Sequence, residues 1–266
     1  MNEFYPFWPG EKVSFHPDIN IYTRQRKKLN LLKKYINNKT GEVLDVGTGS
    51  GEFLELMKDN GWRVSGVEYA KTTSEYAREN LHLNVKTGDL LETNFQSCYF
   101  DLVTLWDSLE HLYSPKETLI EINRILKDDG LLVISTPNID NLAAMMFKNF
   151  WYTNVPRHLY QFSPKTIKLV LKKANFKAFR IIYTAGFCEP VGFAVTFKTL
   201  VQSKFKINSK GPAHMGSNQN PRPSLKTILL FKESLRLVLE LIFLPISILS
   251  VLIKKGPNMI IFAKKC

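Results

Sequence analysis

Residues 42–51 read Glu-Val-Leu-Asp-Val-Gly-Thr-Gly-Ser-Gly, a short apolar strand that runs directly into three glycines at alternate positions. The next stretch, 52–60, has the apolar spacing of a helix, and 63–67 reads as a second strand that ends at Glu68. Strand, glycine turn, helix, strand and terminal acid form the unit expected of a nucleotide-type site in an open parallel sheet. The stretch therefore predicts an α/β fold with a ligand beside the glycine turn.

The class of ligand follows from the acidic residues around this turn. Glycines let the backbone approach a ligand where a Cβ would collide. A dinucleotide site usually has a further glycine at the position of Glu52, and a carboxylate there would repel a pyrophosphate, which disfavours NAD. Glu68 can accept hydrogen bonds from both hydroxyls of a ribose. A phosphate-free adenosyl ligand such as S-adenosylmethionine fits this pattern, and a glycine-rich turn without a ligand is the alternative.

The same residues carry a resemblance to a known family. Asp45-x-Gly47-x-Gly49-x-Gly51 with Glu68 resembles motif I and the ribose acid of the class I S-adenosylmethionine-dependent methyltransferases. The similarity spans roughly residues 20–184 plus the last strand, and it continues through 88–89, 100–103, 109–112, 126–131 and 158–163. It implies a Rossmann-like seven-stranded sheet of order 3-2-1-4-5-7-6, with a hydrophobic helical insertion between strands 6 and 7.

The resemblance also implies the cofactor, S-adenosylmethionine, and the residues around it. Asp89 and Leu90 are placed beside the adenine, with the acid accepting from the exocyclic amine; the alternative for Asp89 is a plain turn residue. The residues that follow the fourth strand are placed under the methyl group. The complete set of expected cofactor contacts is Asp45, Gly47, Thr48, Gly49, Ser50, Gly51, Glu68, Tyr69, Asp89, Leu90, Trp106 and Asp107.

The segment after the fourth strand also bears on the acceptor. Residues 103–112 lack the Asn-Pro-Pro-Tyr or Asp-Pro-Pro-Tyr of enzymes that methylate base amino groups and the Pro-Cys of pyrimidine C5 enzymes. They resemble the O-methyltransferases of ubiquinone biosynthesis and their glycan- or lipid-acting relatives. A hydroxyl acceptor must lose a proton, and His111 is the expected general base because imidazole titrates near neutral pH. A histidine satisfied by Glu110 or capping a helix is the alternative.

Two further groups of side chains have open roles. Asp107, Glu110 and His111 form an Asp-x-x-Glu-His cluster that some related quinone enzymes use for a divalent ion. Two carboxylates and one imidazole make an incomplete shell, so a metal requirement stays unknown. By resemblance, the aromatic stretch 149–162 forms part of the acceptor wall, with His158 and Tyr160 pointing inward; core packing of these aromatics is the alternative.

The remaining elements follow from periodicity and from turn residues. Ser114 is expected to cap a helix that has Pro115 in its first turn and Gly130 just beyond its end. Helices are expected over 19–37, 52–60, 72–80, 115–127 and 164–174. Strands are expected over 43–46, 63–67, 83–87, 101–106, 131–135, 177–184 and 258–264, the last of them antiparallel.

The expected domain organisation has three parts. Residues 1–40 form an N-terminal flap and helix, and 41–184 plus 258–266 form the methyltransferase domain. Residues 185–257 form an apolar and basic helical insertion with a flexible loop at 208–224. The chain leaves the sixth strand at the carboxyl edge of the sheet, so the insertion should stand beside the active site.

Charge and hydropathy suggest a partner for the insertion. The chain has 36 Lys and Arg against 24 Asp and Glu, a net charge of +12, which favours anionic partners. The insertion holds ten Lys or Arg and three Glu, and its apolar run 241–253 is shorter than the roughly 20 residues of a membrane span. Contact with a membrane surface through 185–257 is expected. Packing within the chain or on a second subunit, or a true span, are the alternatives.

The location and the function class complete the prediction. Three scattered cysteines favour a reducing compartment, and the first residues lack the features of a cleaved signal peptide. A cytoplasmic location is therefore expected, with peripheral binding to the inner face of the membrane as an option. The expected reaction is O-methylation of a small-molecule, lipid-, quinone- or glycan-linked hydroxyl near a membrane. Nucleic acid is disfavoured as a partner. The rivals are an RNA or protein methyltransferase, which the positive charge supports, and a non-catalytic scaffold.

Overall fold

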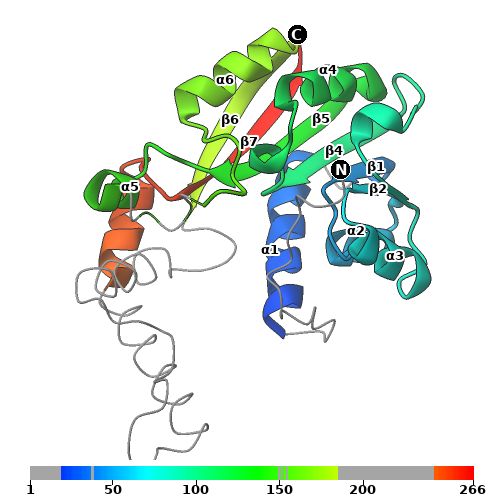
Figure 1. Cartoon of the computed structure of the whole chain (residues 1–266), viewed down its shortest axis with the longest axis horizontal. Coiled ribbons are helices and arrows are strands. Elements are labelled where there is room, and N and C mark those ends of the chain that lie inside the picture. Colours follow the sequence, from blue (N-terminus) through cyan, green and yellow to red (C-terminus); the bar gives the residue numbers. More distant parts are fainter. Residues whose placement is uncertain (1–18, 37–38, 149–150, 152, 154, 185–242) are drawn as a thin grey trace, which may run out of the picture. The chain divides into compact units, whose positions relative to one another are not determined.

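The computed structural model describes residues 19–36, 39–148, 151, 153, 155–184 and 243–266. Their strands form one seven-stranded mixed sheet of order β3-β2-β1-β4-β5-β7-β6 (Figure 1). This is the expected Rossmann-like order, so the predicted fold class is confirmed. The strands are β1 (Glu42–Val46), β2 (Arg63–Glu68), β3 (Val85–Thr87), β4 (Phe100–Trp106), β5 (Leu126–Pro137), β6 (Phe176–Thr184) and β7 (Asn258–Lys265).

The register of the central strands determines where the site lies. β1 pairs in parallel with both β2 and β4, and Asp45 stands opposite Gly66 on one side and Thr104 on the other. β2 pairs in parallel with β3, and β4 with β5. Parallel strands end at the same edge of a sheet, so the turns that follow β1, β2, β3 and β4 gather at one edge.

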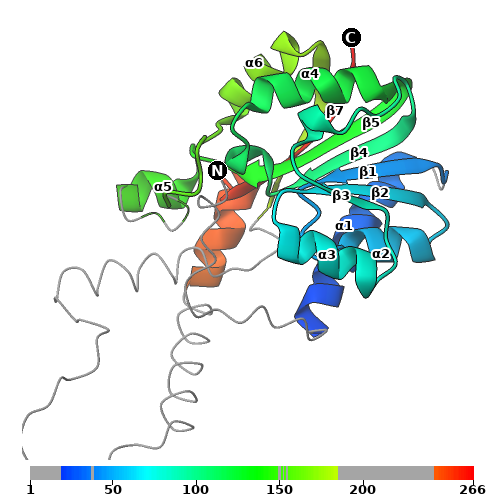
Figure 2. The same ribbon diagram turned by 45° about the vertical axis from the view of Figure 1, so that its right-hand side comes forward.

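Helices cover both faces of this sheet. In the two views, α1 (Ile19–Ile36), α2 (Glu52–Asp59) and α3 (Lys71–Glu79) lie on one face, and α4 (Pro115–Ile125) and α6 (Pro164–Lys173) lie on the other (Figures 1 and 2). α1 buries Leu29 and Leu32, as its spacing predicts. Near its end the Tyr35 ring stacks on Phe262 of β7 with centroids 4.0 Å apart, which fixes α1 against the sheet.

The predicted boundary between the helix 115–127 and the strand 131–135 is wrong. α4 ends at Ile125, and β5 begins at Leu126 instead of at 131. Leu126 pairs with Phe100 and Leu131 pairs with Leu102, so the edge of β5 bulges between these positions. The reason is a non-local contact, because Lys127 forms an ion pair with Asp101 of β4 (2.8 Å). Ser114 occupies the expected N-cap position, but its side chain makes no capping hydrogen bond.

The chain divides into two compact units, and each is described by itself. The first comprises 1–136, 164–182 and 260–266, and the second comprises 137–163 and 183–259. The first unit contains the glycine turn and the buried side chains around it. These include Leu44, Leu54, Phe100, Leu102 and Leu105, all fully enclosed.

The second unit contains α5 (Leu142–Phe147), a helix that the sequence analysis did not identify, and a helix over 243–252. Trp151 is buried with Ala143 and Ala144, and Phe243 and Ile246 pack against this small core. Asn141 caps α5, since its Oδ1 accepts a hydrogen bond from the Ala144 amide (2.8 Å).

The two ends of the predicted insertion meet within this second unit. A Cβ on Gly256 would lie 2.9 Å from the carbonyl oxygen of Thr184, so the two backbones touch. The predicted flexible loop 208–224, most of the insertion (185–242) and the N-terminal flap (1–18) lie outside the described residues. Within the helices that are described, none is long and apolar enough to cross a membrane.

Candidate cofactor and catalytic site

The glycine turn after β1 brings the backbone to the pocket edge and leaves space in front of it. A Cβ on Gly47 would lie 2.6 Å from the Cβ of Ser108, in the turn after β4. A Cβ on Gly49, whose φ is +60°, would meet nothing within 4 Å. Gly47 thus allows close packing of two turns, and the open side of Gly49 is a place where a ligand can approach the backbone.

Glu68 is held in place by two backbone amides. Its Oε2 accepts a hydrogen bond from Gly49 N–H (2.8 Å), and its Oε1 accepts one from Ala70 N–H (2.9 Å). Each carboxylate oxygen can accept a second hydrogen bond, so both remain able to bind a sugar hydroxyl. The predicted ribose acid therefore lies directly beside the glycine turn.

Glu52 is the acid that disfavours a dinucleotide. It is the first residue of α2, and its Oε1 accepts a hydrogen bond from Ser50 Oγ (2.6 Å). In a dinucleotide site the pyrophosphate lies at this helix N-terminus. A carboxylate there suits a cofactor that carries no phosphate.

A pocket in the first unit collects the ends of four strands. Six of the twelve expected cofactor contacts line it: Gly47, Glu68, Tyr69, Asp89, Leu90 and Asp107. The remaining lining residues are Val46, Val67, Gly88, Ser108, His111, Leu112 and Tyr113. The expected catalytic residue His111 thus shares one pocket with the expected ribose and adenine acids.

The other six expected contacts, Asp45, Thr48, Gly49, Ser50, Gly51 and Trp106, are not among the lining residues. Asp45 lies buried behind the glycine turn, where Thr104 Oγ1 donates a 2.6 Å hydrogen bond to its Oδ1. Burial raises the pKa of Asp45 to about 6. Trp106 is also buried, with its ring edge-to-face against Phe53 (5.4 Å between centroids).

Lys28, on α1, is a cation near the site that the sequence analysis did not single out. Its Nζ lies 5.0 Å from the centroid of the Trp106 ring, and its charge lowers the pKa of Asp45 against the effect of burial. Residues four apart share one face of a helix, and Lys28 precedes the buried Leu32 by four. That spacing is the signal that could have identified it.

Asp89 and Leu90 begin the turn after β3. Asp89 Oδ1 accepts a hydrogen bond from the Leu91 amide (2.9 Å), which caps the short helix η1 (Leu90–Glu92). Leu90 is buried. Asp89 is therefore a turn residue that also lines the pocket, and its contact with the adenine stays a prediction.

The turn after β4 is held in an uncommon conformation. Asp107 has a φ of +54°, in the left-handed region that non-glycine residues rarely adopt. Its N–H donates to the Ser135 carbonyl (3.0 Å), and its Oδ1 accepts from Ser135 Oγ (2.7 Å). Such conformations cost on the order of 1–3 kcal/mol and persist where neighbouring contacts hold them, often at functional sites.

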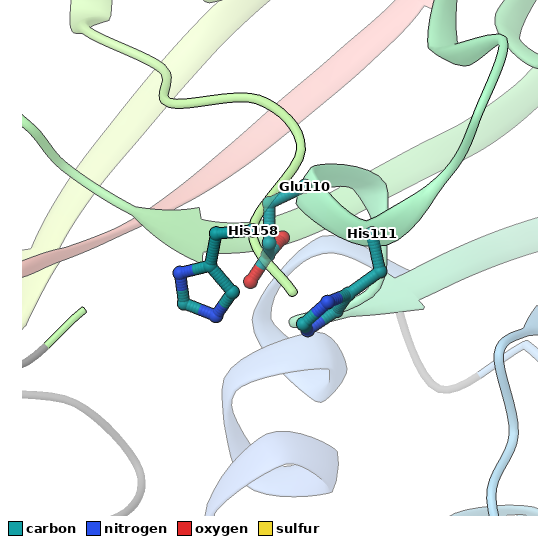
Figure 3. Close-up of side chains that lie close together, drawn as sticks. All are labelled: Glu110, His111 and His158. Atoms are coloured by element: carbon teal, nitrogen blue, oxygen red, sulfur yellow. The ribbon is translucent and has the colours of Figure 1, made fainter. Parts of the chain in front are cut away.

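Glu110 and His111 project from the next short helix, η2 (Leu109–His111) (Figure 3). A carboxylate oxygen of Glu110 and a ring nitrogen of His111 lie within 4.8 Å of each other. Glu110 is only 1% exposed, and Thr136 Oγ1 donates to its Oε2 (3.0 Å). Burial, and then the negative charge of Asp107, raise the pKa of Glu110 to about 8. The third member of the predicted ion cluster, Asp107, has its carboxylate bonded to Ser135.

The predicted acceptor wall belongs to the second unit. There Trp151 and Phe162 are buried, and Tyr160, which is exposed, stacks on Phe162 with centroids 6.3 Å apart. His158 N–H donates to the Val155 carbonyl (3.0 Å). Core packing therefore accounts for two of these aromatics, and an acceptor role for His158 and Tyr160 stays a prediction.

The fold and this site define a class I S-adenosylmethionine-dependent methyltransferase. The chain belongs to the family described as methyltransferase domain, whose model matches residues 20–180. Methyltransferases are enzymes, and S-adenosylmethionine is the cofactor of this class. The open side of Gly49 and the doubly held Glu68 fit that cofactor.

Several curated relatives are ubiquinone biosynthesis O-methyltransferases. The one from Glaesserella parasuis is 35% identical over 127 residues, which is 42% of this chain and 54% of the relative. The one from Haemophilus ducreyi is 30% identical over 150 residues, 52% of this chain and 62% of the relative. The matches thus span less than two thirds of either relative.

Solved structures share the fold at low identity. A SAM-dependent methyltransferase from Archaeoglobus fulgidus superposes with a TM-score of 0.56 at 24% identity, covering 91% of this chain and 94% of its own. Phosphoethanolamine N-methyltransferase 2 from Haemonchus contortus, in complex with S-adenosyl-L-methionine, gives 0.59 at 19% identity, covering 90% of this chain and 52% of its own. At these identities the likeness establishes the fold alone.

Proposed function

We propose that this methyltransferase methylates a hydroxyl oxygen on a lipid-, quinone- or glycan-linked acceptor near a membrane surface. The observation that carries the proposal is that His111 lines the same pocket as Glu68 and Asp89. An imidazole is therefore available as a base at the site that the cofactor residues define. The relatives named as ubiquinone biosynthesis O-methyltransferases support a hydroxyl acceptor.

The proposed cofactor site divides into a sugar end and a base end. Glu68 accepts hydrogen bonds from the ribose hydroxyls while the amides of Gly49 and Ala70 keep its carboxylate in place. Asp89 accepts a hydrogen bond from the adenine amine, and Leu90 packs beside the ring. Because the protein holds Glu68 in advance, binding does not have to order that side chain.

The catalytic step needs alignment and one proton acceptor. When bound, the sulfonium supplies a methyl carbon that is already activated for in-line displacement. His111 would take the proton of the acceptor hydroxyl as the oxygen–methyl bond forms, the methyl–sulfur bond breaks and the neutral thioether leaves. Glu110 stays mostly protonated at neutral pH because its pKa is raised to about 8, so it leaves proton acceptance to the imidazole.

Membrane contact is proposed from the described end of the insertion. The helix over 243–252 and the two residues after it expose five apolar side chains, Leu244, Ile248, Leu249, Leu252 and Ile253, and Lys254 follows them. Helices that lie in the membrane interface combine an apolar face with basic residues. A lysine near an anionic leaflet contributes about 1 kcal/mol.

Flotation with anionic vesicles tests this contact. We expect Leu252→Asp, at a position 73% exposed, to reduce binding to phosphatidylglycerol vesicles several-fold. Leu169→Asp on α6, at a position 54% exposed, is the matched control and should float as the unaltered chain does. Equal loss in both variants would contradict the proposed membrane face.

Labelled methyl transfer into a total cell extract tests the acceptor. We expect label in the lipid or glycan fraction, and we expect His111→Ala to lower incorporation at least tenfold while cofactor affinity stays unchanged. Label confined to RNA or protein would overturn the proposed acceptor class. Full activity of the His111→Ala variant would remove the histidine from the mechanism.

A further inference from the structure

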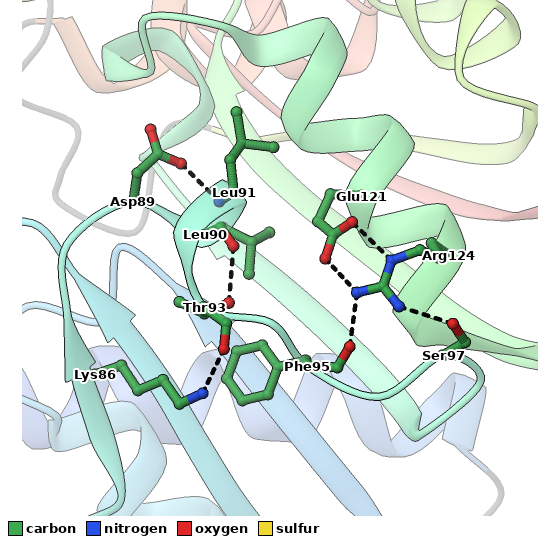
Figure 4. A network of polar contacts seen from close by, with 9 residues as sticks. All are labelled: Lys86, Asp89, Leu90, Leu91, Thr93, Phe95, Ser97, Glu121 and Arg124. Carbon is green, nitrogen blue, oxygen red and sulfur yellow. Dashed lines mark hydrogen bonds and ion pairs between the residues drawn. The ribbon is translucent and has the colours of Figure 1, made fainter.

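Two cations hold the loop that follows η1, and neither lies in the pocket (Figure 4). Lys86, from β3, donates from Nζ to the carbonyl of Thr93 (2.6 Å) and lies 4.2 Å from the centroid of the Phe95 ring. Arg124, from α4, donates from Nη2 to the carbonyl of Phe95 (2.6 Å) and from Nη1 to Ser97 Oγ (2.7 Å). Both cations therefore bind the same short segment, residues 93–97.

Glu121 orients the Arg124 guanidinium. Arg124 Nε donates to Glu121 Oε2 (2.9 Å), and Nη2 donates to Glu121 Oε1 (2.6 Å), one turn away on α4. A bidentate pair of this kind fixes the guanidinium plane and its direction. The same end of α4 also binds the loop through its backbone, because Cys98 N–H donates to the Arg124 carbonyl (3.0 Å).

The held segment is connected to the pocket through Thr93. Lys86 binds the carbonyl of Thr93, and Thr93 Oγ1 donates to the carbonyl of Leu90 (2.7 Å). Leu90 and its neighbour Asp89 both line the pocket. Hydrogen bonds thus connect Lys86, through Thr93, to Leu90, which directly follows Asp89 in the chain.

We propose that Lys86 and Arg124 are positioning residues for the adenine end of the cofactor site. They hold residues 93–97 so that η1 presents Asp89 and Leu90 to the pocket. The inference rests on the proposed cofactor site. The loop needs holding, since Asn94 and Cys98 have φ values of +50° and +52°, in the left-handed region that non-glycine residues rarely adopt.

The expected effect is on affinity more than on global stability. The Arg124 side chain is 42% exposed, and ion pairs at such positions contribute little to the free energy of unfolding. Affinity, however, falls in proportion to the fraction of molecules whose site is in the binding-competent arrangement. Loss of either cation should therefore weaken cofactor binding while the fold persists.

Calorimetry of S-adenosylmethionine binding to the full chain tests the inference. We expect Arg124→Ala, and Lys86→Met, which removes the charge but keeps an unbranched side chain, each to raise the Kd about 5- to 20-fold with little change in Tm. Arg124→Lys keeps a charge but loses the bidentate geometry, so its Kd should lie between those of the unaltered chain and Arg124→Ala. Arg63→Ala is the matched control, because Arg63 also pairs with a carboxylate, that of Glu42, and should leave the Kd unchanged.

Combination with Asp89→Ala separates positioning from general stability. If the cations act through Asp89, the losses in Asp89→Ala/Arg124→Ala should be clearly less than additive. Additive losses, or a Tm that falls in step with the affinity, would overturn the positioning role. If only Asp89→Ala raises the Kd, and the Kd values of Arg124→Ala and Lys86→Met stay within twofold of that of the unaltered chain, the positioning role of the two cations is rejected. The proposed cofactor site is then retained. An unchanged Kd in all of them would reject both.

Discussion

The backbone N–H of Gly49 donates a 2.8 Å hydrogen bond to Oε2 of Glu68, so the turn after β1 and the acid that ends β2 hold each other. Ala70 N–H fixes the second carboxylate oxygen. The acid therefore faces the glycine turn before any ligand arrives. This pair explains why the two motifs occur together in the sequence, because each completes the hydrogen bonding of the other.

A methyl group at Gly49 should block the cofactor without unfolding the chain. We expect Gly49→Ala to weaken S-adenosylmethionine binding at least tenfold, because the new Cβ enters the open space in front of the turn. Gly61→Ala is the control, since Gly61 also has a positive φ (+85°) but lies outside the pocket, where a new Cβ would lie 3.5 Å from Thr40 Cγ2. Both variants should lose about 1 kcal/mol of stability. Equal Kd values by calorimetry would contradict the site.

Replacement of Glu68 by glutamine should weaken the site in two ways. Hydrogen bonds to a charged acceptor contribute about 1.5–3 kcal/mol, and the amide –NH2 of glutamine would face a backbone N–H where an acceptor is needed. We expect the Kd of Glu68→Gln for S-adenosylmethionine to rise about 10- to 100-fold. Glu79→Gln, at an exposed position at the end of α3, should leave it unchanged. Affinity retained in Glu68→Gln would remove the acid from the sugar site.

The raised pKa of Glu110 gives stability a specific pH dependence. The folded chain holds this proton up to about pH 8, whereas the unfolded chain releases it near 4.5, so the carboxyl costs stability as pH rises between these values. Glu110→Gln removes that cost and keeps a carbonyl for Thr136. Its Tm advantage over the unaltered chain should grow from pH 5 to pH 8 and then level off. Glu117→Gln on the surface of α4 should show no such trend, and a pH-independent difference in Glu110→Gln would contradict the assigned burial.

Lys28 should stabilise the fold more where Asp45 is ionised than where it is protonated. Because the pKa of Asp45 is raised to about 6 and Lys28 lowers it, the attraction between them is present above that pH and is lost as the carboxyl protonates below it. Lys28→Met removes the charge and keeps an unbranched side chain, and it should lower the Tm at pH 8 more than at pH 5. Lys27→Met on the exposed side of α1 should change neither value. Equal losses at both pH values would show that packing alone explains Lys28.

Removal of residues 185–255 should leave the fold of the first unit intact, although it takes Phe243 and Ile246 from the small core of the second unit. Thr184 and Gly256 touch, so a short Gly-Ser turn can join them in place of residues 185–255. We expect the shortened chain to retain S-adenosylmethionine binding and to lose flotation with anionic vesicles. Calorimetry and flotation of the same preparation check both outcomes. Retained flotation would contradict membrane contact through this segment.

The sequence predicted most of the sheet because its signals are local. The residues 42–60 contain all the signals of a strand, a glycine turn and a helix. Because β1 and β2 are parallel, Glu68 at the end of β2 lies beside Gly49 in the turn after β1. The start of β5 was missed because the contact that decides it, Lys127 with Asp101, joins distant residues. Lys28 was missed because its contact with the Trp106 ring joins residues that are far apart in the sequence. The helix α5 was missed because six residues are too few to show a helical period.

Gly47 and Ser108 occupy a space that holds one Cβ and no more. The two positions are therefore a single volume shared between distant parts of the chain. An alanine at 47 could be accommodated sterically only beside a glycine at 108, so we expect these two positions to change together among family members. A family member in which the turn with Asp107 and His111 has changed must therefore still have a small residue at position 47.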